Sequence, residues 1–270
     1  MDGAAKVGGD APLLLETCEE GVLRLTLNRP AQRNALSIGL MSALGEALDR
    51  AAADRECRVV IIAGAGPAFC AGHDLREFRA LDNADRRATY QRIFAQCSAL
   101  MLQIVHLAKP VIAEVHGIAT AAGCQLVATC DLAVAAAEAR FATPGVDIGL
   151  FCSTPMVALT RAVGRKSAME MLLTGELIDA ATAKAIGLVN RVVPASELAT
   201  ATAALARQIA AKSALTLAIG KEAFYHQAEL GLADAYSYAA EVMTRNMLAR
   251  DAAEGIDAFL EKRPPVWQDA

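Results

Sequence analysis

The apolar positions of the chain predict four short strands. Residues 22–27 (VLRLTL) alternate apolar and polar side chains, which is the period of a strand with one apolar face. Residues 59–63, 111–115 and 132–136 form short, almost wholly apolar runs bounded by glycine, proline or polar residues. Such runs are typical of strands that are buried on both faces.

Helical periodicity fills most of the sequence between and after these runs. Ser37 is predicted as the N-cap of an amphipathic helix that continues to about Ala53. A longer helix is predicted over residues 84–107 and a short one over residues 121–129. From Thr154 onward the pattern is helical almost throughout.

The order of these elements predicts the fold class. Strands that alternate with helices imply crossover connections and a largely parallel sheet. We therefore expect an α/β core over residues 13–200, followed by a helical C-terminal region over residues 201–270. The chain shows no internal repeat and no low-complexity linker.

The composition excludes several classes of function. The 270 residues are 54% hydrophobic and 21% charged, so the chain is long and apolar enough to bury a substantial core. Its formal net charge is -4 and its Lys and Arg residues are dispersed, which excludes the basic surface of a nucleic-acid binder. The apolar runs are interrupted before they could span a bilayer, so no membrane partner is expected.

The seven cysteines point to a reducing compartment. Their number is odd and no CxxC pair is present, which argues against a disulfide framework or a structural zinc site. Most of them lie in apolar runs and are interpreted as small buried side chains. The first twelve residues, MDGAAKVGGDAP, show no targeting pattern. These observations predict a cytoplasmic protein without a metal site.

A glycine-rich segment, residues 64–72, follows the second predicted strand. A strand followed by GAGPAF resembles the first turn of a dinucleotide-binding unit. However, Phe69 stands in the place of the third glycine, and no acidic residue ends a second apolar strand about twenty residues later. An ordinary surface loop would leave the small residues of AFCAGHDL (residues 68–75) unexplained. The segment is instead interpreted as bringing backbone N–H groups, first that of His73, close to a ligand atom.

A second segment rich in small residues covers residues 109–131 (KPVIAEVHGIATAAGCQLVATCD). It predicts a strand, a tight turn and a short helix that begins near Ala121-Ala122-Gly123. The N-terminus of a helix presents unpaired N–H groups and a positive dipole end, both suited to a developing anion. The alternative is that Ala and Gly here only allow close packing of helix and sheet.

Four stretches of the chain match one known family. They are AFCAGHDL (68–75), KPVIAEVHGIATAAGCQLVATCDLAVAAAEARFATPGVDIGL (109–150), NRPAQRNALS (28–37) and FLEKRPPVWQ (259–268). Together they resemble the crotonase superfamily, the enoyl-CoA hydratase/isomerase family, over roughly residues 13–270. The resemblance implies a crotonase-like ββα-superhelix core and makes the helical region of residues 201–270 a trimerisation region. It also implies a homotrimer or a dimer of trimers.

The resemblance further implies a ligand and a pair of donors. The ligand is an acyl-CoA thioester, bound as substrate with no permanently bound cofactor. In the family, one backbone N–H from each glycine-rich segment holds the thioester oxygen. By position these are the N–H groups of His73 and Ala122. Ala122 replaces a family glycine, which backbone donation permits, and Gly123 keeps its glycine.

Both glutamates of the family's hydratases are missing from this chain. Hydration of a conjugated double bond needs one group to deprotonate water and another to handle the α-proton. The positions of these glutamates are occupied by Gln125 and Gly145, and neither side chain can exchange a proton near neutral pH. Family isomerases and thioester hydrolases place an acid further along, where this chain has Ser153.

Candidate substitutes surround the expected acyl pocket. Asp147, Cys152 and Ser153 lie in the segment that forms the pocket wall in the family, although Asp147 is also suited to capping a turn and Cys152 to being an inert buried thiol. Glu77 and Glu114 could reach the pocket or pair with Arg or Lys.

The coenzyme A moiety is expected to contact another set of residues. The resemblance assigns the nucleotide and pantetheine to Arg29 and the first glycine-rich segment, and the phosphates to a lysine near the C-terminus. These residues are Arg29, Ala71, His73, Asp74, Leu75 and Lys262. A solvated helix end is the alternative interpretation for Lys262.

Three functions follow, in decreasing order of support. The first is a family enzyme that stabilises an enolate with a non-standard acid/base set. The second is a non-catalytic acyl-CoA-binding protein, which the double loss of glutamate favours. The third, a dinucleotide-dependent oxidoreductase, rests on the GAGPAF turn alone.

Overall fold

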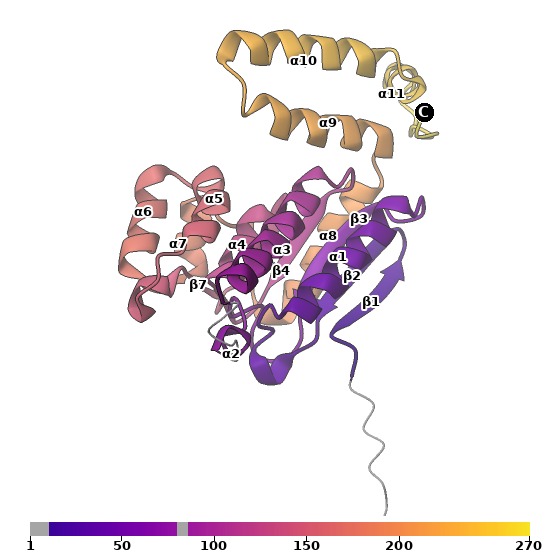
Figure 1. The fold of residues 1–270 in the computed structure, drawn as a ribbon. Coiled ribbons are helices and arrows are strands. Elements are labelled where there is room, and N and C mark those ends of the chain that lie inside the picture. The colour runs from indigo at the N-terminus through magenta and orange to yellow at the C-terminus, as the bar shows by residue number, and fades with distance from the viewer. Residues whose placement is uncertain (1–10, 80–85) are drawn as a thin grey trace, which may run out of the picture.

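The computed structural model describes residues 11–79 and 86–270. A six-stranded sheet with the order β1-β2-β3-β4-β6-β9 forms its centre (Figure 1). Only β1 runs antiparallel to its neighbour, and all other strand pairs of this sheet are parallel. The strands are β1 (Leu14–Glu19), β2 (Val22–Leu27), β3 (Val59–Gly64), β4 (Val111–Val115), β6 (Leu132–Ala136) and β9 (Arg191–Val193). The predicted α/β class with a largely parallel sheet is confirmed.

A smaller sheet, β5-β7-β8, lies beside the main one. Its strands are β5 (Ile118–Thr120), β7 (Arg140–Ala142) and β8 (Ile178–Asp179). The pairing of β5 with β7 is parallel and brings residues 118–120 next to residues 140–142. The sequence pattern predicted none of these strands, because two or three residues are too few to show a period.

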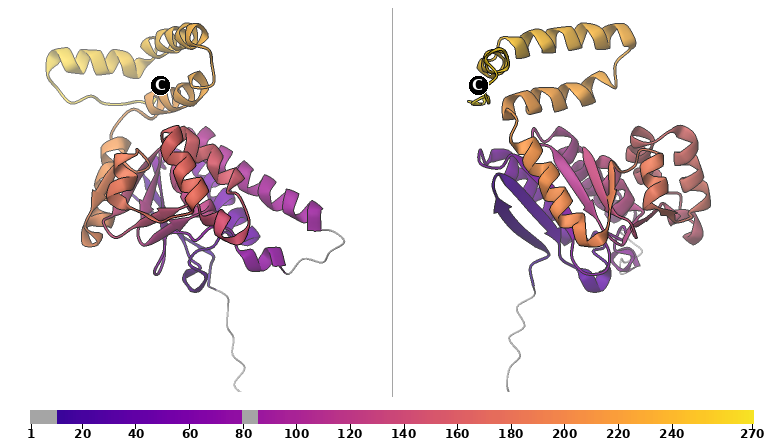
Figure 2. Two further views of the ribbon diagram at one scale, coloured as in Figure 1. Left: turned by 90° about the vertical axis from the view of Figure 1, so that its left-hand side faces the viewer. Right: turned by 180° about the vertical axis from the view of Figure 1, so that it is seen from behind.

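Helices cover both faces of the main sheet (Figures 1 and 2). On one face, α1 (Ile38–Ala53) packs against α3 (Arg86–His106), and on the other α8 (Leu198–Ala210) contacts β3, β4 and β6. The core is accordingly split into two apolar clusters, one on each side of the sheet. This explains why β3 is a continuous apolar run and why β4 is apolar at every position except Glu114.

The predicted helix at Ser37 is confirmed in detail. The Ser37 side chain accepts a hydrogen bond from the Leu40 N–H, so it caps α1 as its position suggested. The α1 helix ends at Ala53, and its buried side chains lie on one face. The predicted helix over residues 84–107 corresponds to α3, and its first two residues lie outside the described residues.

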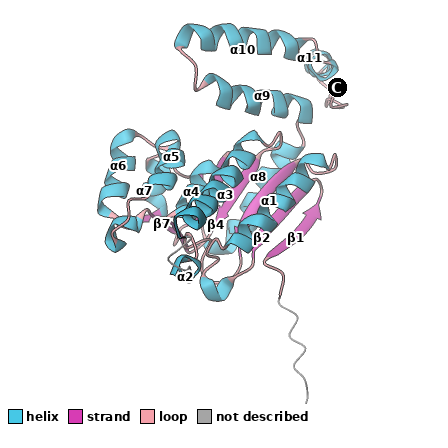
Figure 3. Ribbon diagram, viewed as in Figure 1, coloured by secondary structure: helices cyan, strands magenta, loops and turns pink. Residues whose placement is uncertain are grey.

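Some of the remaining helices contact strands, and others lie away from both sheets (Figure 3). They are α2 (Leu75–Arg79), α4 (Ala122–Thr129), α5 (Ser153–Ala162), α6 (Arg165–Thr174), α7 (Ala180–Ala185), α9 (Ala214–Gln227), α10 (Leu232–Met247) and α11 (Arg250–Glu261). Short 3-10 helices cover Pro30–Gln32, Pro144–Ile148 and Ala195–Glu197. The last three α-helices form a separate layer above the core, whereas α8 lies on the sheet (Figure 1). Residues 201–210 therefore belong structurally to the core.

Candidate active site

The first glycine-rich loop pairs with the segment that follows β4. The Phe69 N–H donates to the His116 carbonyl (3.1 Å), and the Cys70 N–H donates to that of Ile118 (3.1 Å). In return the Thr120 N–H donates to the Cys70 carbonyl (3.0 Å). Because β3 and β4 are parallel neighbours, the loops that leave their carboxyl ends meet at one edge of the sheet.

Two close approaches bring the predicted donor segments together. Gly72 has φ +95°, and a Cβ at this position would lie 2.9 Å from the Ala121 Cβ and 3.4 Å from the Ala122 nitrogen. A Cβ on Gly123 would lie 2.1 Å from the Cys70 carbonyl oxygen. Glycine is required at both positions, because any side chain would separate the two backbones.

The His73 N–H has no hydrogen-bond acceptor among the residues that the structure describes. The Leu36 N–H donates to the Gly72 carbonyl (2.8 Å), and the Asp74 N–H donates to the Leu36 carbonyl (3.1 Å). In a parallel bridge of this kind the intervening residue turns its own N–H away from the partner strand. Within residues 11–79 and 86–270, no hydrogen bond uses the His73 N–H.

Ala122 supplies the second predicted donor from the start of α4. As the first residue of the helix, its N–H has no acceptor within the helix. The preceding Ala121 has φ +49° and ψ -118°, a backbone conformation that favours glycine. Ala121 is held there by two hydrogen bonds, from its N–H to the Ala142 carbonyl and from the Gln125 N–H to its own carbonyl, both 3.0 Å. Strained backbone of this kind is concentrated at functional sites.

Arg29 and Asp74 join the NRPAQRNALS segment to the first loop. One guanidinium nitrogen of Arg29 lies 2.8 Å from Asp74 Oδ2, and the other donates to the Ala35 carbonyl (2.6 Å). Burial alone would raise the pKa of Asp74, but hydrogen bonds from Arg29 and from the Arg76 N–H outweigh it and hold the pKa below its ordinary value. Asp74 is therefore an ionised residue that fixes the loop.

The other predicted CoA contacts are more scattered. The Ala71 N–H donates to the Arg33 carbonyl (3.0 Å), and Leu75 is half exposed at the start of α2. Lys262 ends α11, which lies with α10 at the opposite end of the molecule from α2 (Figure 1). The structure of one chain thus groups Arg29, Ala71, Asp74 and Leu75 but does not bring Lys262 to them.

Gln125 is buried on α4, one turn after the Ala122 N–H. Its side-chain oxygen lies 3.9 Å from the Cys97 sulfur, at the outer limit of a weak hydrogen bond. Burial raises the pKa of the Cys97 thiol to about 11, so this neighbour is neutral at ordinary pH. Neither group supplies a base beside Gln125.

Gly145 lies in a space that is already filled. A Cβ there would fall 2.7 Å from the Leu150 carbonyl oxygen and 2.9 Å from the Cys152 sulfur. A glutamate would therefore require the backbone at Leu150 to move. Burial raises the pKa of Cys152, as expected for an unreactive thiol.

The other acyl-pocket candidates lie at the surface. Asp147 is exposed, and its Oδ2 lies near Gly175, where a Cβ would be 3.2 Å away. Ser153 begins α5, and its hydroxyl donates to the Phe151 carbonyl (3.3 Å). Neither side chain has a described contact with Gln125 or Gly145.

Glu77 and Glu114, each predicted either to reach the pocket or to pair with Arg or Lys, both have hydrogen-bond partners in the structure. Glu114 forms a two-point ion pair with Arg24 of β2, on the face of the sheet covered by α8. Glu77 accepts a hydrogen bond from the Ile38 N–H (2.9 Å) at the start of α1. Both glutamates therefore bind groups outside the expected acyl pocket.

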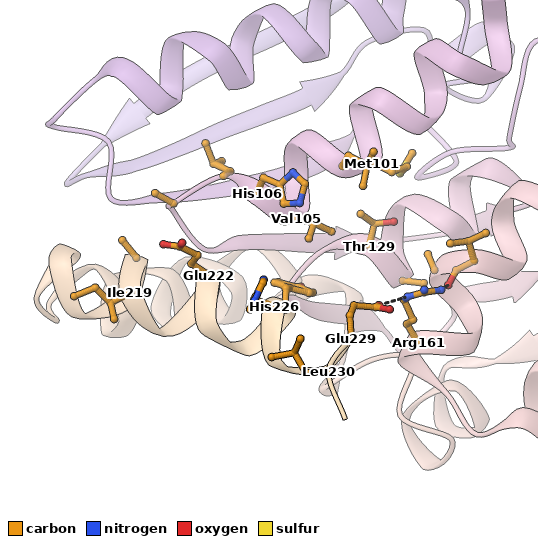
Figure 4. Close-up of a pocket in the computed structure, with 18 of the residues that line it drawn as sticks. Met101, Val105, His106, Thr129, Arg161, Ile219, Glu222, His226, Glu229 and Leu230 are labelled. Carbon is orange, nitrogen blue, oxygen red and sulfur yellow. Dashed lines mark hydrogen bonds and ion pairs between the residues drawn. The ribbon is translucent and has the colours of Figure 1, made fainter. Parts of the chain in front are cut away.

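A cavity of about 1410 Å³ lies between the core and the C-terminal helices (Figure 4). Met101 and Val105 of α3 face Ile219 and His226 of α9 across it. Its lining includes Gln125 but, among the described residues, neither His73 nor Ala122. The α4 helix thus borders this cavity with Gln125, Ala128 and Thr129, and not with its first residue.

The comparisons with known proteins decide the family. A family profile described as Enoyl-CoA hydratase/isomerase matches residues 17–270. The chain belongs to the enoyl-CoA hydratase/isomerase family. The expected membership of the crotonase superfamily is confirmed.

Relatives cover nearly the whole chain. Enoyl-CoA hydratase domain-containing protein 3, mitochondrial, from Xenopus laevis is 48% identical over 95% of this chain and 86% of its own length. The crystal structure of an enoyl-CoA hydratase from Mycobacterium smegmatis is 53% identical, with a TM-score of 0.92 over 95% of this chain and 99% of that one. The human domain-containing protein 3 structure is 45% identical, with a TM-score of 0.90 over 95% of this chain and 100% of that one. The predicted crotonase-like fold is confirmed.

The predicted cytoplasmic location is contradicted by these relatives. Five vertebrate relatives, 44% to 48% identical, are named as mitochondrial proteins. The prediction failed because unpaired cysteines indicate only reducing conditions, which are not confined to the cytoplasm. None of the described helices is long and apolar enough to cross a membrane.

Family membership leaves the dinucleotide hypothesis without support. In a dinucleotide-binding unit the glycine-rich turn opens directly into a helix. Here ten residues separate β3 from α2, and Phe69 in that loop is fully buried. The side chain at the third glycine position is therefore part of the core.

Proposed function

We propose that the chain binds an acyl-CoA thioester and that the N–H groups of His73 and Ala122 donate hydrogen bonds to its carbonyl oxygen. The observation that carries this proposal is the contact at Gly72, which sets the loop of His73 against the start of α4. Neither N–H group donates to another acceptor among the described residues. Family membership supports the choice of an acyl-CoA ligand.

Such a pair of donors favours an enolate over the neutral thioester. Negative charge develops on the oxygen when a proton leaves the α-carbon, and fixed N–H dipoles stabilise that charge without having to reorient. Removing one donor of this kind typically costs about 2.7–4 kcal/mol in the transition state. The helix dipole of α4 adds to the effect at Ala122.

A second candidate function is acyl-CoA binding without turnover. Gln125 and the filled space at Gly145 favour it, since neither position offers a group that exchanges protons. We propose that ordinary hydration of an enoyl-CoA is slow in this protein. Catalysis of another reaction would need an acid or base other than the residues at these two positions.

We also propose a homotrimer or a dimer of trimers. The last two helices carry many exposed apolar side chains, which a monomer rarely leaves uncovered. They are Leu232, Tyr236, Met243, Met247, Ile256, Phe259 and Leu260. Lys262 follows these residues at the end of α11, where its side chain would reach the CoA site of a neighbouring subunit.

Calorimetric titration with acetyl-CoA and with NAD tests the ligand class. Binding of acetyl-CoA without NAD is expected, and tight NAD binding alone would refute the proposal. Gly72→Ala is expected to abolish acetyl-CoA binding, because its methyl group would meet Ala121. Gly149→Ala is the matched control: Gly149 also has a positive φ (+75°), but a Cβ there meets nothing within 4 Å.

A further inference from the structure

The side chain of His73 lies against two aromatic rings, those of Phe78 and Phe94. Its imidazole meets Phe78 of α2 edge-on (centroids 5.7 Å apart, 84° between planes) and Phe94 of α3 likewise (5.8 Å, 80°). Phe78 stacks on Phe94 (5.6 Å, 30°) and also contacts Tyr90 (5.5 Å). We call Phe78, Tyr90 and Phe94 the aromatic clamp.

The imidazole within this clamp has no hydrogen-bond partner in the described part of the chain. Both ring nitrogens are buried, and neither forms a hydrogen bond with any described residue. Leaving a buried polar atom unpaired destabilises the folded protein, so the arrangement calls for a compensating role. Donation from the backbone, as proposed above, makes no use of the ring.

We propose that the aromatic clamp positions the His73 N–H beside that of Ala122, and that Phe78 and Phe94 are positioning residues for thioester binding. The proposal rests on the function proposed above. Edge-to-face contacts have a preferred geometry, so two of them at once restrict where the ring can lie. Because ring and N–H share one Cα, the backbone of His73 is restricted as well.

The clamp is attached to the core through α3. Phe94 belongs to α3, and Gln96 of the same helix donates to the Ile38 carbonyl (3.1 Å) and to the Ser42 hydroxyl (2.9 Å) of α1. The helix thus connects His73 to the core on one side of the sheet. On the other side of His73, Leu36 holds its neighbours through the parallel bridge.

The clamp also disfavours a charge on the imidazole. Burial lowers the pKa of His73, and the nearby Leu36 carbonyl opposes this only in part. The ionisable groups around it have other partners: Asp74 pairs with Arg29, Glu77 accepts from the Ile38 N–H, and the Tyr90 hydroxyl donates to the Phe78 carbonyl. The charged side chains of α2 and α3 near the clamp are exposed; they are Arg76, Arg79, Arg86, Arg87 and Arg92.

The sign of the pH effect follows from the lowered pKa. The neutral ring stabilises the clamped loop fully above pH 6.5, the ordinary pKa of histidine, and this contribution is lost as pH falls through the lower pKa of the folded state. Acetyl-CoA affinity is therefore expected to fall in the same acidic window. A loop held without His73 would not show this dependence.

Two measurements on the full-length protein test the proposal. In the first, NMR titration of the imidazole resonances is expected to give His73 a pKa below 6.5, and Phe94→Ala is expected to raise it. In the second, Phe94→Ala is expected to weaken acetyl-CoA binding at neutral pH about three- to tenfold, the loss of one or two aromatic contacts. Phe94→Trp, which keeps a ring edge, is expected to restore most of the affinity.

Leu15→Ala is the control, because Leu15 is 41% exposed on β1, away from the proposed site and from the C-terminal helices, and should leave both measurements unchanged. An ordinary pKa for His73, or full acetyl-CoA affinity in Phe94→Ala, would overturn the clamp proposal alone. Absence of acetyl-CoA binding by the wild type would instead overturn the proposed function. If Phe94→Ala does not fold, Phe94→Leu and the wild-type titration still decide the question.

Discussion

Lys221 Nζ lies 2.7 Å from Asp131 Oδ2, and this pair joins α9 to the amino end of the main sheet. Lys221 also donates to the carbonyls of Ile104 and Lys109, and Asp131 accepts from the Tyr225 hydroxyl (2.9 Å). The lysine side chain is 7% exposed and the aspartate 17%. A pair this buried, with its other hydrogen bonds satisfied, fixes the position of the C-terminal helices.

Lys221→Met is accordingly expected to lower the free energy of unfolding by about 3 kcal/mol. The substitution removes one partner of a buried pair and leaves the Asp131 carboxylate without its counter-charge. Urea unfolding measures the loss, and limited proteolysis between α8 and α9 reports whether the helices detach. Lys262→Met, at an exposed helix end, should change neither. Equal stability of the two variants would show that α9 is held by other contacts.

Hydration of crotonyl-CoA is expected to be slower than in glutamate-bearing relatives by about two to four orders of magnitude, the usual contribution of general acid–base catalysis. Gln125→Glu alone is expected to restore little, because Gly145 offers no second carboxylate. Adding Gly145→Glu is expected to destabilise the protein, since its Cβ would meet the Leu150 carbonyl. Absorbance loss of the enoyl thioester measures the rate. Ordinary hydratase rates in the wild type would reveal another acid.

Ala121→Gly is expected to stabilise the protein by about 1 kcal/mol. Releasing an alanine from a strained backbone conformation recovers about 1–3 kcal/mol, and the greater freedom of glycine in the unfolded chain offsets part of this gain. Ala122→Gly, in the regular backbone of the adjacent helical residue, is expected to be neutral or mildly destabilising. Thermal unfolding of both variants gives the comparison. A lower melting temperature for Ala121→Gly would mean that its methyl group packs better than its backbone conformation suggests.

Thiol labelling is expected to show one fast-reacting cysteine. Cys18 is exposed, whereas the other six cysteines are buried. Burial raises the pKa of both Cys70 and Cys124 to about 12, so the reactive thiolate is scarce in each. With an aromatic disulfide reagent at pH 8, one equivalent of cysteine should react quickly. The other six cysteines should react only when the protein unfolds. Cys18→Ser should remove the fast phase, and its persistence would identify a second accessible thiol.

The features of the site that the sequence predicts are those set by residues adjacent in the chain. The small residues around Gly72 and Gly123 indicate where the backbone is closely approached, and in the structure both glycines lie against the backbone of another segment. No pattern in the sequence predicts the aromatic clamp. Phe78 and Phe94 are separated by a polar stretch, and their contact with His73 depends on how α2 and α3 return to the loop.

The sequence by itself determined the elements and the family. Period-two and period-3.6 patterns record which side chains face a core. The elements β2, β3, β4, β6, α1, α3 and α4 were therefore predictable. Only the tertiary structure decided which polar groups pair: Glu114 with Arg24, Arg29 with Asp74, and Lys221 with Asp131. Charge pairs between elements depend on distances of a few ångströms after folding, and hydrophobic periodicity carries no information about them. The same holds for the imidazole of His73, whose surroundings come from two helices that lie after it in the chain.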